Sequence, residues 1–295
     1  MLSLRQIITL LILFITTVFI GAKGLALWHP PQPEEMYPFN FAAAPGQDSK
    51  LGWGFVRSKN EVPPYVPEWE KELLQAYDAV YMLPGDERRI SLTFDMGYER
   101  AGATPRILDI LDRHQVKATF FLTGHWVDTQ PELLNQIAQK GHIIGNHTRN
   151  HPDLTNITPD QRAEEILSLH RKIEQTANYS PRYLRPPEGR FSRESLNACR
   201  NLGYQTVFWS ISAVDWLPTA NAQEIHDTVL GQLHPGAIIL LHGNAQAVVD
   251  QLESLIVDIK ARNYQFVPLS VISTPAGPPA PTDTPAPPES PANPQ

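Results

Sequence analysis

Short apolar runs alternate with amphipathic stretches from about residue 88 to residue 273. Runs such as Ala237-Ile-Ile-Leu-Leu241 are continuous, which indicates strands buried on both faces, as in a parallel sheet covered by helices. The stretches between them place apolar residues at helical spacing, and several begin at a capping residue such as Ser192 or Asn221. The pattern predicts strands at 90–95, 118–123, 142–146, 183–185, 205–211, 237–241 and 265–269, and helices at 104–114, 131–140, 159–176, 193–202, 222–233 and 246–262.

These seven strands and six helices alternate along the chain, and no glycine-rich dinucleotide fingerprint accompanies them. Such alternation is typical of α/β folds, and we predict a distorted (β/α)7 barrel rather than an open doubly wound sheet. Upstream, apolar residues at helical spacing predict a further helix at 67–83. The aromatic residues of 51–56 indicate that this stretch docks on the surface of the domain.

Composition divides the chain into four segments. In segment 1–28, the apolar run 7–22 is short for a membrane span and suits a signal peptide, although residues 25–28 would extend it into an uncleaved membrane anchor. Both alternatives place the rest of the chain outside the cytoplasm, facing the cell wall, with membrane contact only through this segment. The other segments are a proline-rich stem with a docking helix at 29–87, the barrel domain at 88–273 and a disordered, proline-rich tail at 274–295.

The charge pattern argues against nucleic acid as a partner. The formal net charge is −7, and the basic residues are scattered, whereas phosphate binding needs a basic patch. Cys199 is the only cysteine, which excludes an intrachain disulfide and a metal site built from several thiolates. Its position in a predicted helix between leucines indicates a small, buried apolar residue.

Five polar clusters follow predicted strands, at the edge where parallel α/β sheets carry their chemistry. They are Asp95; His147 with His151; Arg185, Pro187 and Glu188; Asp215 with Trp216; and His242. The two histidines in the second cluster are four residues apart, so that both imidazoles can bind one metal ion. Two such histidines on a surface helix are often only solvated, but their place after a buried strand favours ligands. An imidazole pair suits zinc, and also cobalt, nickel or manganese when oxygen ligands complete the shell.

Asp95 is then the natural base for an attacking water, or alternatively a carboxylate that caps its loop. Arg185 would hold Asp95 ionised, unless it forms only an ordinary surface ion pair. The Glu188 amide is a candidate oxyanion donor.

His242 closes an apolar strand and is placed as a general acid for a leaving amine, with Asp215 to orient and charge it. A core histidine with satisfied hydrogen bonds is the alternative. Trp216 offers a flat apolar wall for a sugar ring, or else packs in the core. His125 follows the second predicted strand, and we expect it to be structural.

In this order, Thr93-Phe-Asp95, His147-Thr-x-x-His151, Arg185-x-Pro-x-Gly189, Asp215-Trp216 and Leu240-x-His242 resemble the motifs of the polysaccharide deacetylases, the NodB-homology or carbohydrate esterase 4 family. The resemblance covers about residues 88–272. It implies a distorted seven-stranded β/α barrel and metal-dependent removal of N- or O-acetyl groups from a glycan.

The resemblance carries the family's site roles onto matching positions. It implies that Asp95 is the base and Arg185 its tether, and that His242 is the acid oriented by Asp215. The implied metal ligands are His147 and His151, and the implied substrate contacts are Trp216, Pro187 and Glu188.

Further stretches are similar to the delta-lactam-biosynthetic de-N-acetylases within that family: Gly97-Tyr-Glu99, Phe120-Phe-Leu-Thr-Gly-His125 and Phe208-Trp-Ser210. That subgroup acts on N-acetylmuramic acid of peptidoglycan during spore cortex formation. The resemblance therefore implies a peptidoglycan N-deacetylase whose partner is cell-wall glycan. Deacetylation of N-acetylglucosamine chains or of another polysaccharide is the alternative.

Met96 departs from the family pattern, because most members carry a second Asp there that completes the metal site. A thioether is a poor ligand for hard cations. The expected divalent cation (Zn, Co or Mn) would therefore need an oxygen from Glu99 or from water. A wall-binding pseudoenzyme without a metal is the alternative from another functional class.

Overall fold

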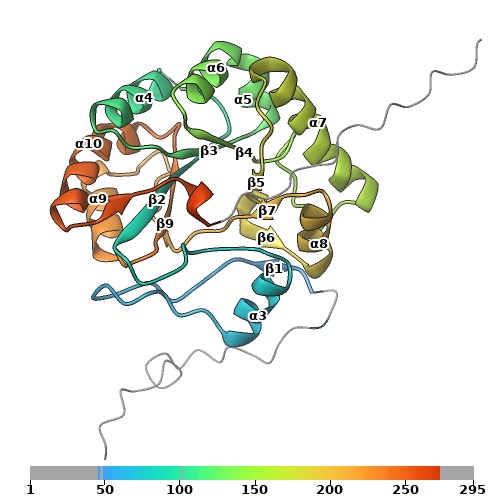
Figure 1. The fold of residues 1–295 in the computed structure, drawn as a ribbon, viewed down its shortest axis with the longest axis horizontal. Coiled ribbons are helices and arrows are strands. Elements are labelled where there is room, and N and C mark those ends of the chain that lie inside the picture. Colours follow the sequence, from blue (N-terminus) through green and yellow to red (C-terminus); the bar gives the residue numbers. More distant parts are fainter. Residues whose placement is uncertain (1–45, 47–48, 101, 273–295) are drawn as a thin grey trace, which may run out of the picture. The chain divides into compact units, whose positions relative to one another are not determined.

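The computed structural model describes residue 46 and residues 49–100 and 102–272 (Figure 1). The expectations for a signal or anchor at 1–28 and for the tail at 274–295 concern residues outside this range. Among the residues that the structure describes, there is no helix with the length and apolar character needed to cross a membrane.

A curled parallel sheet forms the centre of the fold, with helices around it (Figure 1). Hydrogen-bonded neighbours follow the order β7-β5-β4-β3-β2-β9-β8, and β10 also pairs with β2. Each of these pairs is parallel, which confirms the α/β class with a parallel sheet. The strands are β2 (Arg89–Met96), β3 (Thr119–Leu122), β4 (Ile143–Asn146), β5 (Tyr183–Leu184), β7 (Gln205–Thr206), β8 (Ile211–Ser212), β9 (Ile238–His242) and β10 (Gln265–Phe266).

The continuous strand predicted at 205–211 is wrong, because this stretch forms two strands, β7 and β8, at opposite ends of the sheet path. The residues between them cross from one end to the other. The Val207 N–H donates to Leu184 of β5 (2.8 Å), whereas the Ser210 N–H donates to Ile238 of β9 (3.0 Å). A single short segment therefore links the two edges of the curled sheet.

Most helices lie within a few residues of their predicted positions. Helix α5 (Gly124–Thr129) was not predicted, and it begins where the Thr123 hydroxyl accepts from the Trp126 N–H (3.4 Å). On α8 (Arg193–Asn201), Cys199 is buried as expected, and burial raises the pKa of its thiol to about 12. The remaining helices of the sheet region are α4 (Ala103–Arg113), α6 (Pro131–Gln139), α7 (Pro159–Ala177), α8 (Arg193–Asn201), α9 (Ala222–Gly231) and α10 (Gln246–Ala261), with 3₁₀ turns η1 (Pro187–Gly189) and η2 (Leu269–Val271).

The helix predicted at 67–83 is shorter in the structure, where α3 spans Glu68–Ala76. Asp78 adopts a left-handed conformation (φ 55°), and the Ala79 N–H donates back to the Leu74 carbonyl (2.9 Å). These features end the helix. Val80, which the periodicity assigned to the helix, instead forms a bridge with Val207.

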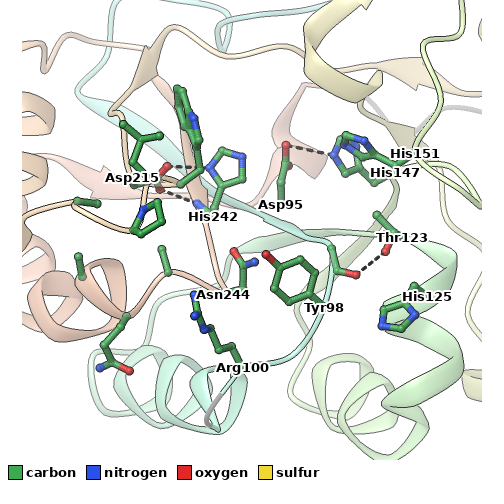
Figure 2. Close-up of a pocket in the computed structure, with 18 of the residues that line it drawn as sticks. Asp95, Tyr98, Arg100, Thr123, His125, His147, His151, Asp215, His242 and Asn244 are labelled. Carbon is green, nitrogen blue, oxygen red and sulfur yellow. Dashed lines mark hydrogen bonds and ion pairs between the residues drawn. The ribbon is translucent and has the colours of Figure 1, made fainter.

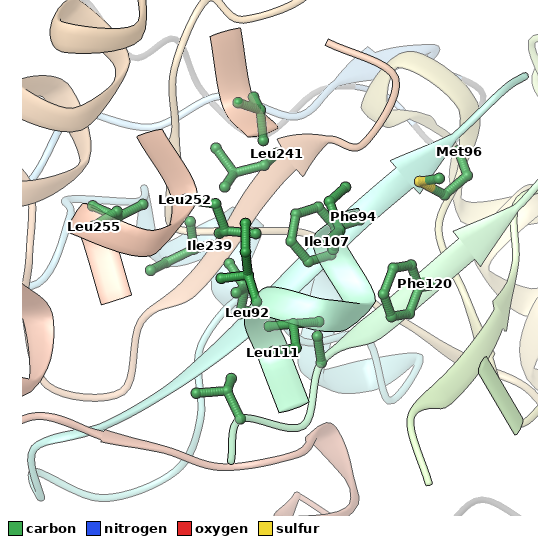
Figure 3. Close-up of a cluster of buried hydrophobic side chains, with 14 of the residues drawn as sticks. Leu92, Phe94, Met96, Ile107, Leu111, Phe120, Ile239, Leu241, Leu252 and Leu255 are labelled. Atoms are coloured by element: carbon green, nitrogen blue, oxygen red, sulfur yellow. The ribbon is translucent and has the colours of Figure 1, made fainter. Parts of the chain in front are cut away.

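Alternation along β2 separates the core from the interior of the curled sheet. Leu92, Phe94 and Met96 are fully or almost fully buried and belong to the cluster with α4 and α10 (Figure 3). Thr93 and Asp95 point to the other face, because successive side chains of a strand alternate between faces. The apolar packing therefore fixes the register that presents Asp95 to the site.

The stretch before α3 packs against the segments that follow β5 and β7. Strand β1 (Leu51–Gly52) pairs antiparallel with β6 (Arg190–Phe191). Trp53 donates its Nε1–H to the Trp209 carbonyl (2.8 Å), and its ring stacks on Phe208 at 5.0 Å between centroids.

Candidate active site

A cleft of about 1200 Å³ opens at the carboxyl ends of the central strands. Its lining includes Asp95, His147, His151, Asp215, Trp216 and His242, so the structure brings together most of the residues singled out from the sequence. In Figure 2, Asp95 lies between His242 on one side and the histidine pair on the other. Pro187 and Glu188 are not among the lining residues, and the Glu188 carboxylate is exposed and pairs with Arg190 (3.0 Å).

Arg185, which is fully buried, binds the Asp95 carboxylate. The Arg185 Nη1 atom donates to Asp95 Oδ1 (2.7 Å), and Nη2 donates to Thr93 Oγ1 (2.9 Å). The carbonyls of Val207 and Phe208 accept two further hydrogen bonds from the guanidinium. The pair is therefore buried and hydrogen-bonded throughout, unlike an ordinary surface ion pair.

The environment of Asp95 favours its ionised form. Burial opposes ionisation, but the charge of the Arg185 guanidinium, with smaller contributions from His147 and His242, outweighs it and holds the pKa of Asp95 below its usual value. Asp95 is 6% exposed, and it faces the cleft. At neutral pH this carboxylate can accept a proton from a molecule in the cleft.

The loop after β4 presents the histidine pair. Thr148 and His151 have positive φ (69° and 57°), and the rings of His147 and His151 are 4.8 Å apart between centroids. The buried Asn146 side chain sets this turn, because its Oδ1 accepts from the Thr148 N–H (2.8 Å) while its Nδ2 donates to Tyr204 (3.1 Å). A turn with left-handed residues, rather than a helical turn, brings the imidazoles together.

His147 has the tautomer of a metal ligand. Its Nδ1 donates to the Arg185 carbonyl (2.8 Å), which leaves Nε2 with its lone pair, 3.5 Å from Asp95 Oδ2. Burial lowers the pKa of His147 to about 4, so its contact with Asp95 is not an ion pair at neutral pH. The donor chemistry of His147 and His151 therefore fits two positions of a divalent cation.

Within the described residues, no group of three His, Cys, Asp or Glu side chains is placed to share an ion. Met96 is fully buried, and a Cβ built on Gly243 would lie 2.2 Å from its sulfur, so its side chain packs beneath the β9–α10 loop. Glu99, considered as a substitute, is engaged elsewhere, because it accepts hydrogen bonds from the backbone and hydroxyl of Thr104 at the start of α4.

His242 and Asp215 form a second charged pair in the cleft. The His242 Nδ1 donates to Asp215 Oδ1 (2.7 Å), and its backbone N–H donates to Oδ2 (2.7 Å). Burial opposes protonation of His242, but the hydrogen bond and charge of Asp215 outweigh it and raise the pKa of the imidazole above its usual value. Trp216 is 57% exposed and lies edge-on to His242, with 5.6 Å between ring centroids, so it is a cleft wall and not a core residue.

Several lining residues were missed or interpreted differently from the sequence. His125 was expected to be structural, but it lines the cleft from α5. Tyr98 and Arg100 line it from the loop after β2, and Asn244 from the loop after β9 (Figure 2). Their position a few residues beyond Asp95 and His242 is the signal that could have identified them, since loops after parallel strands meet at one edge.

Comparison with known proteins agrees with this geometry. The sequence profile of the family described as polysaccharide deacetylase matches residues 83–207. The peptidoglycan-N-acetylmuramic acid deacetylase PdaA of Bacillus subtilis is 44% identical over 221 residues, which cover 73% of this chain and 83% of that protein. A peptidoglycan-N-acetylglucosamine deacetylase of Bacillus cereus is 36% identical over 200 residues, covering 66% and 72%.

The solved structure of B. subtilis PdaA, described as a family 4 carbohydrate esterase, superposes with a TM-score of 0.74 at 41% identity and covers 76% of this chain and 97% of that one. Sequence identity, coverage and fold agree. The chain therefore belongs to the polysaccharide deacetylase family.

Proposed function

We propose that the protein is a peptidoglycan N-deacetylase that hydrolyses the acetamide of N-acetylmuramic acid in the cell wall, outside the cytoplasm. The observation that carries this proposal is the pair of oppositely tuned groups across the cleft. Arg185 donates a hydrogen bond to Asp95 and lowers the pKa of that carboxyl, whereas Asp215 accepts one from His242 and raises the pKa of that imidazole. A base and an acid with separated pKa values are what amide hydrolysis requires.

The proposed reaction uses these groups in turn. Asp95 takes a proton from water as the water oxygen bonds to the acetamide carbonyl carbon. His242, whose Nδ1 is bound to Asp215, gives the Nε2 proton to the sugar nitrogen as the carbon–nitrogen bond breaks. The products are acetate and an amino sugar. Arg185 stays hydrogen-bonded to Asp95 and orients it throughout.

A divalent cation, such as zinc, cobalt or manganese, would be held by His147 and His151, and when bound it would polarise the carbonyl and acidify water. Any further ligands would have to come from water or substrate, since Met96 packs under Gly243 and Glu99 is hydrogen-bonded to Thr104. Trp216 offers an exposed aromatic face to a sugar ring. We do not assign Pro187 or Glu188 a substrate contact, because neither lines the cleft.

The muramic acid assignment follows the name of the B. subtilis relative and the subgroup motifs. The amine released on muramic acid lies next to a lactyl carboxyl group, with which it can condense to a delta-lactam, as in spore cortex. The B. cereus relative is named for N-acetylglucosamine, and this sugar is the alternative substrate. The absence of a three-ligand cluster among the described residues favours a second candidate, a metal-deficient wall-binding protein.

The decisive experiment measures acetate released from peptidoglycan, with and without stem peptides, in the presence and absence of a chelator. We expect release by the parent protein and its loss in Asp95→Asn. Asp109→Asn, which removes an exposed carboxylate of α4 paired with Arg113, is the matched control and should keep full activity. Equal release by the Asp95→Asn protein would refute the mechanism, and glycan binding without release by the parent would favour the wall-binding candidate.

A further inference from the structure

The crossover segment between β7 and β8 (residues 207–210) lies where the ends of the curled sheet are not joined by strand pairing. β7 and β8 are the two ends of the sheet path. The backbone of this segment nevertheless contributes to the site, because the carbonyls of Val207 and Phe208 accept hydrogen bonds from Arg185 (3.2 and 3.3 Å). Arg185 in turn binds Asp95 (2.7 Å). The position of the crossover segment therefore sets the position of the guanidinium.

Residues that precede β2 in the chain hold this crossover segment. Val80 forms a parallel bridge with Val207. The Val80 N–H donates to the Thr206 carbonyl (2.9 Å), and the Val80 carbonyl accepts from the Phe208 N–H (2.7 Å). The Val207 N–H points to the opposite side, where it donates to Leu184 of β5 (2.8 Å). Val80 therefore takes the place of a neighbouring strand on the side of the segment that β5 leaves open.

Trp53 binds the same segment and also the loop that follows Arg185. Its Nε1–H donates to the Trp209 carbonyl (2.8 Å), and its ring stacks on Phe208 with 5.0 Å between centroids. Its backbone N–H donates to the Gly189 carbonyl (2.9 Å). Gly189 has a positive φ of 65°, and a Cβ built on it would lie 2.8 Å from the Trp209 ring and 3.1 Å from Trp53. These contacts leave no room for a side chain at residue 189.

The Trp209 side chain connects the Trp53 hydrogen bond to the guanidinium. The Arg185 Cζ atom lies 5.6 Å from the centre of the Trp209 ring and 4.2 Å from the centre of the Phe121 ring. Cation–π attraction to these rings adds to the hydrogen bonds from the crossover segment. A shift of residues 208 and 209 would therefore move one carbonyl and one ring that contact Arg185.

We infer that Trp53 is a positioning residue for the reaction, because with Val80 it holds the crossover segment where Arg185 binds Asp95. Neither Trp53 nor Val80 lines the cleft. The stretch 51–56, expected from the sequence only to dock on the domain, would thus act on the proposed base. This inference rests on the proposed function. Small displacements of a base lower the rate of the chemical step, whereas an intact cleft lining preserves substrate binding.

The kinetic test is Trp53→Phe, which removes the indole N–H and keeps an aromatic ring. Trp69→Phe is the matched control, because Trp69 packs against the same aromatic cluster and its buried Nε1 has no hydrogen-bond partner in the part of the chain that the structure describes. On peptidoglycan, we expect Trp53→Phe to lower kcat roughly tenfold with KM within about twofold of the parent. Trp69→Phe should keep the parent kcat. Equal kcat in all three proteins, or equal losses in both variants, would overturn the inference.

A measurement without substrate separates failure of this inference from failure of the proposed function. Arg185 is fully buried, and its Nε–H, bound to the Val207 carbonyl, gives a nitrogen-15 NMR signal whose exchange with solvent can be timed. We expect exchange to be roughly tenfold faster in Trp53→Phe and unchanged in Trp69→Phe, with β3 amide protons unchanged in both. This result supports the positioning role even if the parent releases no acetate. Unchanged Arg185 exchange, or equal acceleration in β3, would overturn it.

Discussion

Replacing Arg185 by Met should cost more stability than any exposed substitution, and the cost should depend on the charge of Asp95. The Arg185 side chain is fully buried and donates to Asp95, Thr93 and two backbone carbonyls. Its removal leaves the Asp95 carboxylate buried without a cation, which typically destabilises a protein by about 3–5 kcal/mol. That is a large part of the roughly 5–15 kcal/mol that holds a domain folded.

A double-mutant cycle isolates the pair. Asp95→Asn in the Arg185→Met background removes the uncompensated charge, so the double variant should be more stable than the sum of the single effects by about 2 kcal/mol. Urea unfolding followed by tryptophan fluorescence measures all four proteins. Arg171→Met, which breaks an exposed pair with Glu164, is the control and should change stability by less than about 0.5 kcal/mol.

The stability difference between the parent and Arg185→Met should also depend on pH, in a direction set by the pKa of Asp95. In the parent, the pKa of Asp95 is depressed, so its ionisation stabilises the protein above the usual carboxyl pKa, and this contribution is lost as pH falls through the depressed value. In Arg185→Met, burial acts without the opposing cation and raises the pKa of Asp95. The difference between parent and variant should therefore shrink as pH falls from neutrality to roughly pH 4. Additive effects, or a pH-independent difference, would refute this reasoning.

Three further predictions follow from contacts around the cleft. In urea titrations, Met96→Ala should lower the free energy of unfolding by about 2–5 kcal/mol, and Met96→Leu by less than about 1.5 kcal/mol. Equal losses would contradict the placement of Met96 in the core. Asn146→Ala should weaken zinc binding roughly 10- to 100-fold by calorimetry, because the turn that carries the histidine pair loses its hydrogen bond to Asn146. Asn135→Ala, which removes a hydrogen bond to the Pro131 carbonyl on α6, should not. Asp215→Asn should lower the pKa of His242. Because the proposed mechanism requires protonated His242, the alkaline limb of the pH–rate profile should move to lower pH. If that limb does not move, His242 is not the acid.

The sequence was sufficient for the order of elements and for the positions of most site residues. Apolar runs and helical spacing report burial directly, so β2, β9 and most helices lie where periodicity predicted them. Residues that end parallel strands meet at one edge whatever the details of the sheet, so Asp95 and His242 could be assigned to one site before any contact was known.

The sequence pattern gave wrong predictions where hydrogen bonding between distant segments decided the secondary structure. The stretch 205–211 has the composition of one strand, but its two ends bond to opposite edges of the sheet. Val80 fits a helix by spacing, yet it pairs with Val207, and this pairing is compatible only with a helix that ends earlier. The hydrophobic pattern indicates which residues are buried, but it does not indicate which segment packs against them.

The charge state of the site was likewise decided by tertiary structure. Asp95 and Arg185 are 90 residues apart, and only the fold places the guanidinium behind the carboxylate. The Met96 side chain packs against Gly243, and Glu99 accepts a hydrogen bond from Thr104 at the start of α4. Both contacts depend on the fold. The sequence by itself determined which chemical groups stand at the sheet edge. The tertiary structure decided which of them are paired, buried or free to bind, because pairing and burial depend on atoms brought together from distant parts of the chain.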